Sequence, residues 1–383
     1  MQNEKKDPRV ILSRIVSLSI SFFCVLLLMG KLFVHVISQT TIGGMLVLLI
    51  AVEAMLFLVM MVHVVIHEAG HLLFGLATGY QFSFFRIGSL MLLKQDGKIT
   101  CKKFRIAGTA GQCMMEPPEP AGGTFPAVLY NMGGSILNLA AGAVFYFVYR
   151  LSGGGGAVGL FWYMMSILGF HYALSNGIPL HTATVNNDGY NILSLTRSPE
   201  AREAFRIRMK VSEKLAKGVR LKDMPEDWFW IPSDKDMRNG MLAGIGVNTC
   251  CRLMDQHRFE EAGILAERLL QVGRGMAGIQ RNSMICNLIY LELIGENRAE
   301  RLRQLYTPQR KRLMKKMRTS PEVLRTEYVH ALLAEQNIGK AQTILARFEK
   351  TARTYPYSSE IQAERELMEL AAVQMSQAGN AHA

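Results

Sequence analysis

The chain has 383 residues, of which 49% are hydrophobic and 19% are charged, and its formal net charge is +12. This balance is typical of a protein that is partly membrane-embedded and partly soluble, and the length allows two domains. The positive charge lies in loops and a tail that flank apolar runs, and no nucleic-acid-binding motif is visible, so we expect no nucleic acid partner. The six cysteines include no CxxC pair, which favours a reducing, cytosolic setting for the soluble parts.

Four apolar segments are long enough to cross a bilayer. They follow a polar, basic tail at residues 1–9, and the loops at residues 38–44 and 152–156 carry no charge. Basic loops on one side and neutral loops on the other predict a multi-pass protein of the cell membrane with both termini in the cytosol. The membrane domain is expected over residues 10–190, with spans at about 11–37, 45–78, 125–151 and 158–178.

Residues 80–115, between the second and third spans, have a different sequence pattern from the long apolar segments. Short apolar runs flank Asp96-Gly97, a dipeptide that is typical of hairpin turns. The pattern predicts a small cytosolic β-hairpin region. Two roles are open for it: a structural cap, or an exposed edge that pairs with an extended peptide.

The second span carries His67-Glu68-Ala69-Gly70-His71 near its cytosolic end. Histidines four residues apart share one face of a helix, so His67 and His71 can hold one zinc ion with Glu68 beside it as general base. Ionisable groups within a membrane segment are costly and usually functional. The alternative is that these side chains only pack between helices or pair with one another. His63 lies too far along the helix to share an ion with His71, so we interpret it as an outer-shell or core residue.

A catalytic zinc site needs a third protein ligand. The candidates are Asp188, His181 and His171. Asp188 is favoured because it is a carboxylate just past the fourth span, on the same cytosolic side as His71, and His181 is the next choice.

Three motifs together resemble those of a known family. They are the HEAGH sequence in one span, Gly133-Gly134 followed by Asn138 in the next, and Asn176-x-x-Pro179 followed by Asp188-Gly189. Over residues 45–195 the chain resembles the site-2 protease family, the intramembrane zinc metallopeptidases called peptidase M50. It departs from the family pattern in the longer gap before Asp188 and in Tyr190, which stands in place of a second glycine.

The resemblance implies that Zn²⁺ is the cofactor, that His67, His71 and Asp188 are its ligands and that Glu68 is the general base. It also implies that Asn176 positions the substrate and that the hairpin region guides it. Asn138 is interpreted as a contact between helices, with substrate positioning as its second possible role. The expected substrate is a membrane-anchored peptide or protein.

The rest of the chain is charged and helical. Residues 191–239 are expected to form a helical linker. Residues 240–383 are expected to form a TPR-like domain, because Ala262, Ala299 and Ala341 each follow a polar turn, with separations of 37 and 42 residues. Such arrays usually bind partners, so a cytosolic protein partner is predicted for residues 240–356. The basic cluster at residues 310–318 is either a solvated face or a contact with anionic lipid.

The predicted fold is therefore mainly α: a membrane helical bundle of about four spans, a small cytosolic β-hairpin region and a C-terminal helical-hairpin domain. The predicted function is an intramembrane zinc endopeptidase. The alternative is an inactive, protease-like membrane scaffold whose TPR-like domain binds a cytosolic partner.

Overall fold

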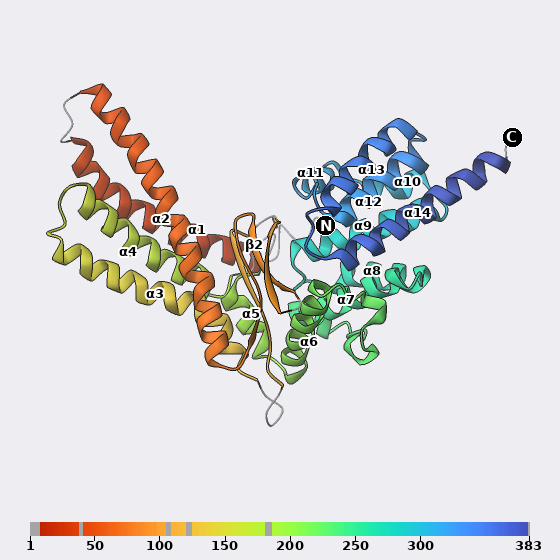
Figure 1. The fold of residues 1–383 in the computed structure, drawn as a ribbon, viewed down its shortest axis with the longest axis horizontal. Helices are drawn as coiled ribbons and strands as arrows, with labels where there is room; N and C mark the ends of the chain where they lie inside the picture. The colour runs from red at the N-terminus through yellow and green to blue at the C-terminus, as the bar shows by residue number, and fades with distance from the viewer. Residues whose placement is uncertain are drawn as a thin grey trace. The chain divides into compact units, whose positions relative to one another are not determined.

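The computed structural model describes residues 8–37, 41–95, 97–104, 109–119, 125–180 and 186–381 (Figure 1). The chain is mostly helical, as predicted. It divides into two compact units, one formed by residues 1–88 and 109–193, the other by residues 89–108 and 194–383. Each unit is described by itself below.

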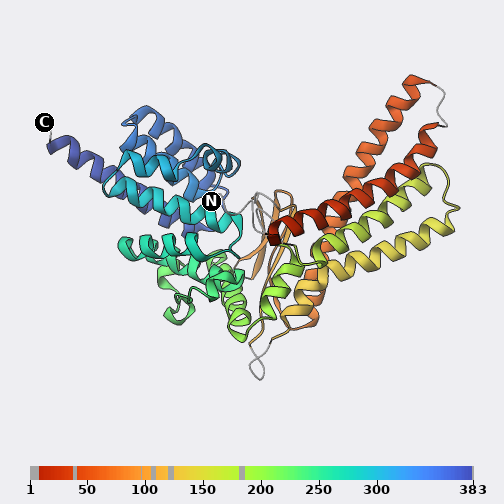
Figure 2. The same cartoon turned by 180° about the vertical axis from the view of Figure 1, so that it is seen from behind.

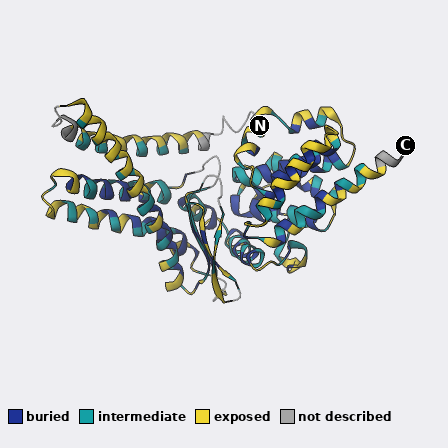
Figure 3. Cartoon of the chain, turned by 45° about the horizontal axis from the view of Figure 1, so that its top comes forward, coloured by how far each residue is buried: buried dark blue, intermediate teal, exposed yellow. Residues whose placement is uncertain are grey.

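Within its described residues, the first unit contains four apolar helices that are long enough to cross a membrane. Their positions agree with the four predicted spans to within a few residues. Figure 3 shows many exposed residues on these helices, and many of them are large and apolar. The elements of this unit are α1 (Pro8–Ile37), α2 (Ile42–Ala77), β1 (Gln81–Ile87), β4 (Gly111–Glu116), α3 (Ala127–Leu151), α4 (Gly156–Gly177) and the greater part of α5 (Asp188–Leu195).

Helix α2 is the longest helix of the bundle. It begins after Thr41, whose side-chain oxygen accepts a hydrogen bond from the backbone N–H of Gly44 at 3.1 Å and so caps the helix. Its 36 residues extend about 54 Å, more than the roughly 30 Å of a bilayer's hydrocarbon layer. The helix therefore tilts within the layer or projects beyond it.

Small residues allow the membrane helices to approach closely. A Cβ atom at Gly70 of α2 would lie 2.3 Å from the carbonyl oxygen of Gly133 on α3, so only glycine fits there. Glycines also meet where α3 and α4 cross, since a Cβ at Gly169 would lie 2.7 Å from Cα of Gly142. Figure 2 shows α1 beside α4 on the other side of the bundle. These contacts leave little freedom for α2 to shift against α3.

Strands β1 and β4 form an antiparallel pair beside the bundle. Their register runs from Gln81 opposite Glu116 to Ile87 opposite Gly111, with an irregularity after Phe82. A β-region is thus confirmed within residues 80–115, but the sequence interpretation did not single out β4 as a strand.

The second unit combines a hairpin with a set of helices. Strands β2 and β3 are antiparallel, and Gly97 in their turn has a φ of +77°, the left-handed conformation that the Asp-Gly signal predicts. The hairpin contacts the helices through Gln95, whose amide donates to the carbonyl of Ala216 at 3.0 Å. The elements are β2 (Leu90–Gln95), β3 (Lys98–Lys103), α6 (Pro199–Ala216), α7 (Gly240–Asp255), α8 (Phe259–Val272), α9 (Gly278–Ile294), α10 (Ala299–Leu305), α11 (Pro308–Lys316), α12 (Pro321–Val329), α13 (Ile338–Ala352) and α14 (Ser358–Ala381).

An internal repeat is visible in the turns of this unit. The turns after α7, after α9 and before α13 each contain a residue with positive φ: His257 at 59°, Asn297 at 50° and Gln336 at 50°. These residues lie 40 and 39 residues apart and mark three helical hairpins. The TPR-like character of the region stays a prediction.

In the middle hairpin, the residue predicted for the repeat position is wrong. Ala262 and Ala341 lie five residues after their turn residues and are buried. The residue at the same place in the middle hairpin is Leu302, which is buried too, whereas Ala299 is exposed. A larger side chain therefore fills the position that the sequence interpretation assigned to an alanine.

Charged side chains are also buried among these helices. Arg325 is fully buried, lies 3.1 Å from the carboxylate of Glu364 and donates to the amide oxygen of Asn287 at 3.0 Å. Burial raises the pKa of Glu364 to about 7, even though the Arg325 charge opposes it. Burial likewise raises the pKa of Glu360 to about 7.

Candidate metal centre

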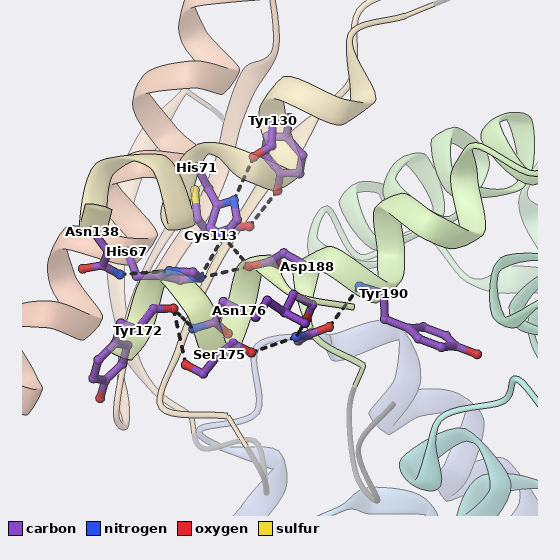
Figure 4. Close-up of polar contacts among 12 residues, drawn as sticks. His67, His71, Cys113, Tyr130, Asn138, Tyr172, Ser175, Asn176, Asp188 and Tyr190 are labelled. Atoms are coloured by element: carbon purple, nitrogen blue, oxygen red, sulfur yellow. Dashed lines mark hydrogen bonds and ion pairs between the residues drawn. The ribbon is translucent and has the colours of Figure 1, made fainter. Parts of the chain in front are cut away.

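His67 and His71 bring two imidazole nitrogens to one point inside the first unit. They lie one turn apart on α2, both are buried, and their Nε2 atoms are 3.2 Å apart (Figure 4). The rings meet edge to face, with centroids 4.8 Å apart. The predicted shared face is therefore present, and both nitrogens point to the same place.

Asp188 adds a carboxylate from a distant part of the chain. It is the first residue of α5, and its Oδ2 atom lies 3.0 Å from Nε2 of His67 and 3.4 Å from Nε2 of His71 (Figure 4). Burial by itself would raise the pKa of Asp188, but the two neighbouring imidazoles outweigh it and hold that pKa below its usual range.

The three atoms form a nearly equilateral triangle with sides of 3.0, 3.2 and 3.4 Å. Ligands at the corners of a tetrahedron around zinc, with bonds of about 2.0–2.1 Å, are separated by about 3.3 Å. Two nitrogens and one carboxylate oxygen are also a donor set that catalytic zinc sites use. The residues present therefore fit a zinc ion with a fourth position for water.

Asn187 anchors Asp188, although the sequence interpretation gave it no role. Its side-chain amide donates to the carbonyls of Ser175 and Ile178 at 2.8 and 2.6 Å. Its side-chain oxygen accepts from the backbone N–H groups of Leu180 and Tyr190 at 3.0 and 2.9 Å. These four bonds tie the end of α4 to the start of α5. Asn187 directly precedes α5, where asparagine is a preferred capping residue, but the sequence interpretation placed the start of the helix at residue 191.

Gly189 brings the two helix ends together next to Asp188. A Cβ atom at this position would lie 2.3 Å from the carbonyl oxygen of Gly177. The Asp-Gly pair therefore has a physical reason here, because only glycine permits this approach.

The second nitrogen of His71 contacts a backbone carbonyl. Its Nδ1 lies 2.8 Å from the carbonyl oxygen of Tyr130 on α3, and the Tyr130 hydroxyl in turn donates to the carbonyl of Cys113 on β4 at 2.8 Å. A carbonyl can only accept, so Nδ1 of His71 carries the proton and Nε2 offers its lone pair. This is the usual outer contact of a metal-binding histidine.

The second nitrogen of His67 contacts a side-chain amide. Nδ1 of His67 lies 3.1 Å from the amide of Asn138 on α3, and the same amide lies 3.0 Å from Nδ1 of His63. Asn138 thus joins α2 to α3, which agrees with its interpretation from the sequence as a contact between helices. His63 does not belong to the group of possible metal ligands among the described residues, as expected for an outer-shell or core residue.

Glu68 lies against strand β4. It is buried, and a Cβ atom at Gly111 would be 2.5 Å from its Oε1 atom. Arg86 on β1, fully buried, donates to the carbonyl of Gly111 at 3.1 Å and to the hydroxyl of Thr109. Arg86 therefore fixes the start of β4 where it meets the Glu68 carboxyl group. The sequence interpretation missed both Gly111 and Arg86, because no local pattern marks them.

The other predicted site residues make different contacts. Asn176 donates to the carbonyl of Tyr172 in its own helix at 3.0 Å. His171 packs edge-on against Tyr172 and does not belong to the group of possible metal ligands, which comprises His67, His71 and Asp188 in the described part of the chain. His181 lies outside the described residues.

Comparison with known proteins gives a family. The model of peptidase family M50 matches residues 55–372, well over half of the chain, so the chain belongs to peptidase family M50. No curated protein and no solved structure matches it significantly. The members of this family are zinc metalloproteases, and the four apolar helices agree with a multi-pass membrane protein. The match extends through the helical region, beyond the segment that carries the recognisable motifs.

Proposed function

We propose that the chain is an intramembrane zinc endopeptidase that cleaves a peptide bond in a membrane-anchored substrate. The observation that carries this proposal is the triangle of His67, His71 and Asp188, which has the size of a tetrahedral zinc site and lies next to a buried glutamate. Family membership supports the same reaction class. The inactive scaffold is not favoured, because the complete set of hydrolytic side chains is assembled in one place.

His67, His71 and Asp188 would hold the metal, which when bound supplies an activated water and polarises the scissile carbonyl. Glu68 then acts as general base: one of its carboxylate oxygens takes a proton from the water as the water oxygen attacks the carbonyl carbon. As the carbon–nitrogen bond breaks, Glu68 gives that proton to the leaving nitrogen. The products are a free carboxylate and a free amine.

The substrate must be extended at the site, because a helix closes its own backbone hydrogen bonds and hides its peptide groups. Among the described strands, β4 pairs with β1 alone, and its first residue lies against Glu68. An extended segment that pairs with β4 would pass beside the catalytic carboxylate. Of the two roles considered for the β-region, we therefore favour peptide binding, with Arg86 holding β4 in place.

The orientation in the membrane and the partners belong to the proposal too. The placement of basic residues supports cytosolic N- and C-termini. The helical hairpins between residues 240 and 356 would then face the cytosol, where a protein partner could select or present the substrate. Asn176 and Asn138 remain candidates for positioning the substrate.

The test separates metal binding from catalysis. The full-length protein, purified in detergent, is assayed for bound zinc and for cleavage of a panel of fluorescent single-span peptides. Glu68→Gln should keep one zinc per chain and lose cleavage by at least about 100-fold. Cleavage by Glu68→Gln at the rate of the parent protein would contradict the assignment of the general base.

A further inference from the structure

His63 is a buried polar residue in a membrane helix for which the proposed reaction has no use. It is fully buried one turn before His67, and its ring lies between Phe145 and Tyr172, with centroids 6.1 and 5.9 Å away. Its Nε2 atom lies 2.7 Å from the carbonyl oxygen of Met165 on α4. Polar groups in a bilayer are expensive, so this position calls for an explanation.

The carbonyl of Met165 determines where the ring carries its proton. A carbonyl oxygen only accepts hydrogen bonds, so Nε2 of His63 must donate to it. The contacts of both ring nitrogens are uncharged, a carbonyl and an amide, and a charged ring at this depth would be costly. The ring is therefore neutral, and its Nδ1 atom presents a lone pair to Asn138.

That lone pair determines the orientation of the Asn138 amide. The two ends of an amide group exchange by a half-turn about one bond, and their hydrogen-bonding partners decide which end is which. Nδ1 of His63 needs a donor, so the NH₂ end of Asn138 faces His63. As placed, the amide oxygen lies 3.0 Å from Nδ1 of His63 and the amide nitrogen lies 3.1 Å from Nδ1 of His67. The half-turn exchanges these two atoms, so that the oxygen faces Nδ1 of His67. If the amide oxygen faced His63, Nδ1 of His63 would have to carry the proton. Nε2 would then be an acceptor facing the Met165 carbonyl oxygen, which is also an acceptor, unless the ring carried both protons and a positive charge.

We propose that His63 is a positioning residue that acts through Asn138 to hold His67 in the tautomer that binds zinc. Nδ1 of His67 donates to Asn138, which leaves the Nε2 lone pair directed at His71 and Asp188. The Tyr130 carbonyl fixes the same tautomer of His71 by direct contact with its Nδ1 atom. Both zinc-binding imidazoles thus take their tautomer from a backbone carbonyl, one by direct contact and one through two side chains. This inference rests on the proposed zinc site.

Zinc affinity tests the proposed relay, which is the chain of hydrogen bonds from His63 through Asn138 to His67, without reference to proteolysis. The full-length protein in detergent is titrated with zinc against a chromophoric chelator. His63→Leu removes both hydrogen bonds of the ring, and we expect affinity to fall about 10- to 100-fold, as for the loss of other outer-shell partners. His63→Gln can accept from Asn138 and donate to Met165, and it should stay within about threefold of the parent.

Ser166→Ala is the matched control. Ser166 is also fully buried and donates to the carbonyl of Gly142 at 3.0 Å, so its loss removes a buried hydrogen bond between α3 and α4 without touching a histidine. We expect unchanged zinc affinity. If His63→Leu binds zinc as tightly as the parent, while His67→Ala does not, the relay is wrong and the zinc site stands. If the parent binds no zinc, the proposed function itself fails.

A spectroscopic readout needs no destabilising variant. In the zinc-loaded parent labelled with ¹⁵N-histidine, His63 should be neutral and protonated at Nε2, and His63→Gln assigns its signals. A His63 ring protonated at Nδ1 would require the opposite orientation of Asn138 and would overturn the proposal.

Discussion

The Nε2 atom of His67 and the Oδ2 atom of Asp188 lie 3.0 Å apart, although 121 residues separate them along the chain. Helix α2 supplies the histidine, and the start of α5 supplies the carboxylate. The hydrogen bonds of Asn187 and the close approach of Gly189 to Gly177 keep the aspartate in this place. The two halves of the proposed zinc site are therefore joined by tertiary structure alone.

Asp188→Asn should remove zinc binding. The substitution keeps the shape of the side chain but takes away the charge and one strong ligand atom. We expect affinity to fall by more than the roughly 10- to 100-fold that accompanies loss of an outer-shell partner. Chelator competition measures this, with Asp227→Asn on the exposed surface as control. An Asp188→Asn protein with parental zinc affinity would point to another third ligand.

Gly134→Ala should disturb the metal centre from α3. A Cβ atom at this position would lie 2.5 Å from Cε1 and 2.6 Å from Nδ1 of His67, so the ring must shift. Overpacking of this kind costs about 1–3 kcal/mol, and both thermal stability and zinc affinity should fall. Gly30→Ala is the control, since no atom lies within 4 Å of a Cβ in that membrane helix. Equal effects of the two substitutions would show that Gly134 has no special contact with His67.

Gly111→Ala should impair catalysis and spare the metal. The added methyl group would meet Oε1 and Cγ of Glu68 at 2.5 and 2.6 Å and displace the carboxyl group, whereas the zinc ligands lie outside this contact. A misplacement of about 1 Å can cost about 100-fold in rate, so cleavage should fall by about that factor at unchanged zinc content. Loss of zinc together with activity would mean that β4 supports the ligands and not the base.

The helical part of the second unit should lose stability between pH 5 and pH 7. Burial raises the pKa of Glu360 and of Glu364 from 4.5 to about 7, so the folded state keeps protons that the unfolded chain has released. The unfolded state binds fewer protons in this window, and stability falls as pH rises. The effect is on the order of 3 kcal/mol for each carboxyl group.

Urea unfolding of the full chain can measure this, followed by fluorescence of Trp228 and Trp230 in a Trp162→Phe background. Glu364→Gln removes one titrating group and should reduce the pH dependence, whereas Glu369→Gln, exposed on the same helix, should leave it unchanged. Stability that rises between pH 5 and pH 7 in the parent would contradict the raised pKa values.

The local features of the site were predictable from the sequence. His67, Glu68 and His71 follow from a spacing that one helix converts directly into a shared face, and the four apolar helices follow from composition. Asp188 was favoured because it is a carboxylate just past the fourth span, and the resemblance to a family implied the same ligand. Its approach to the two histidines depends on how α4 and α5 join, which the sequence does not show.

The features that the sequence did not reveal depend on contacts between distant segments. Gly111 meets Glu68 only because β4 pairs with β1, and a lone glycine carries no sign of such a partner. His63 looked like a core residue because its role depends on Asn138 and on the backbone of α4. The predicted repeat position was wrong in the middle hairpin, because the buried residue at the equivalent place is Leu302 and not an alanine.

X-ray absorption spectroscopy of the zinc-loaded, full-length protein tests the central claim most directly. We expect two imidazole nitrogens and oxygen ligands at about 2.0–2.2 Å, with one imidazole lost in His67→Ala. Sulfur ligands at about 2.3 Å, or a zinc environment that His67→Ala leaves unchanged, would contradict it.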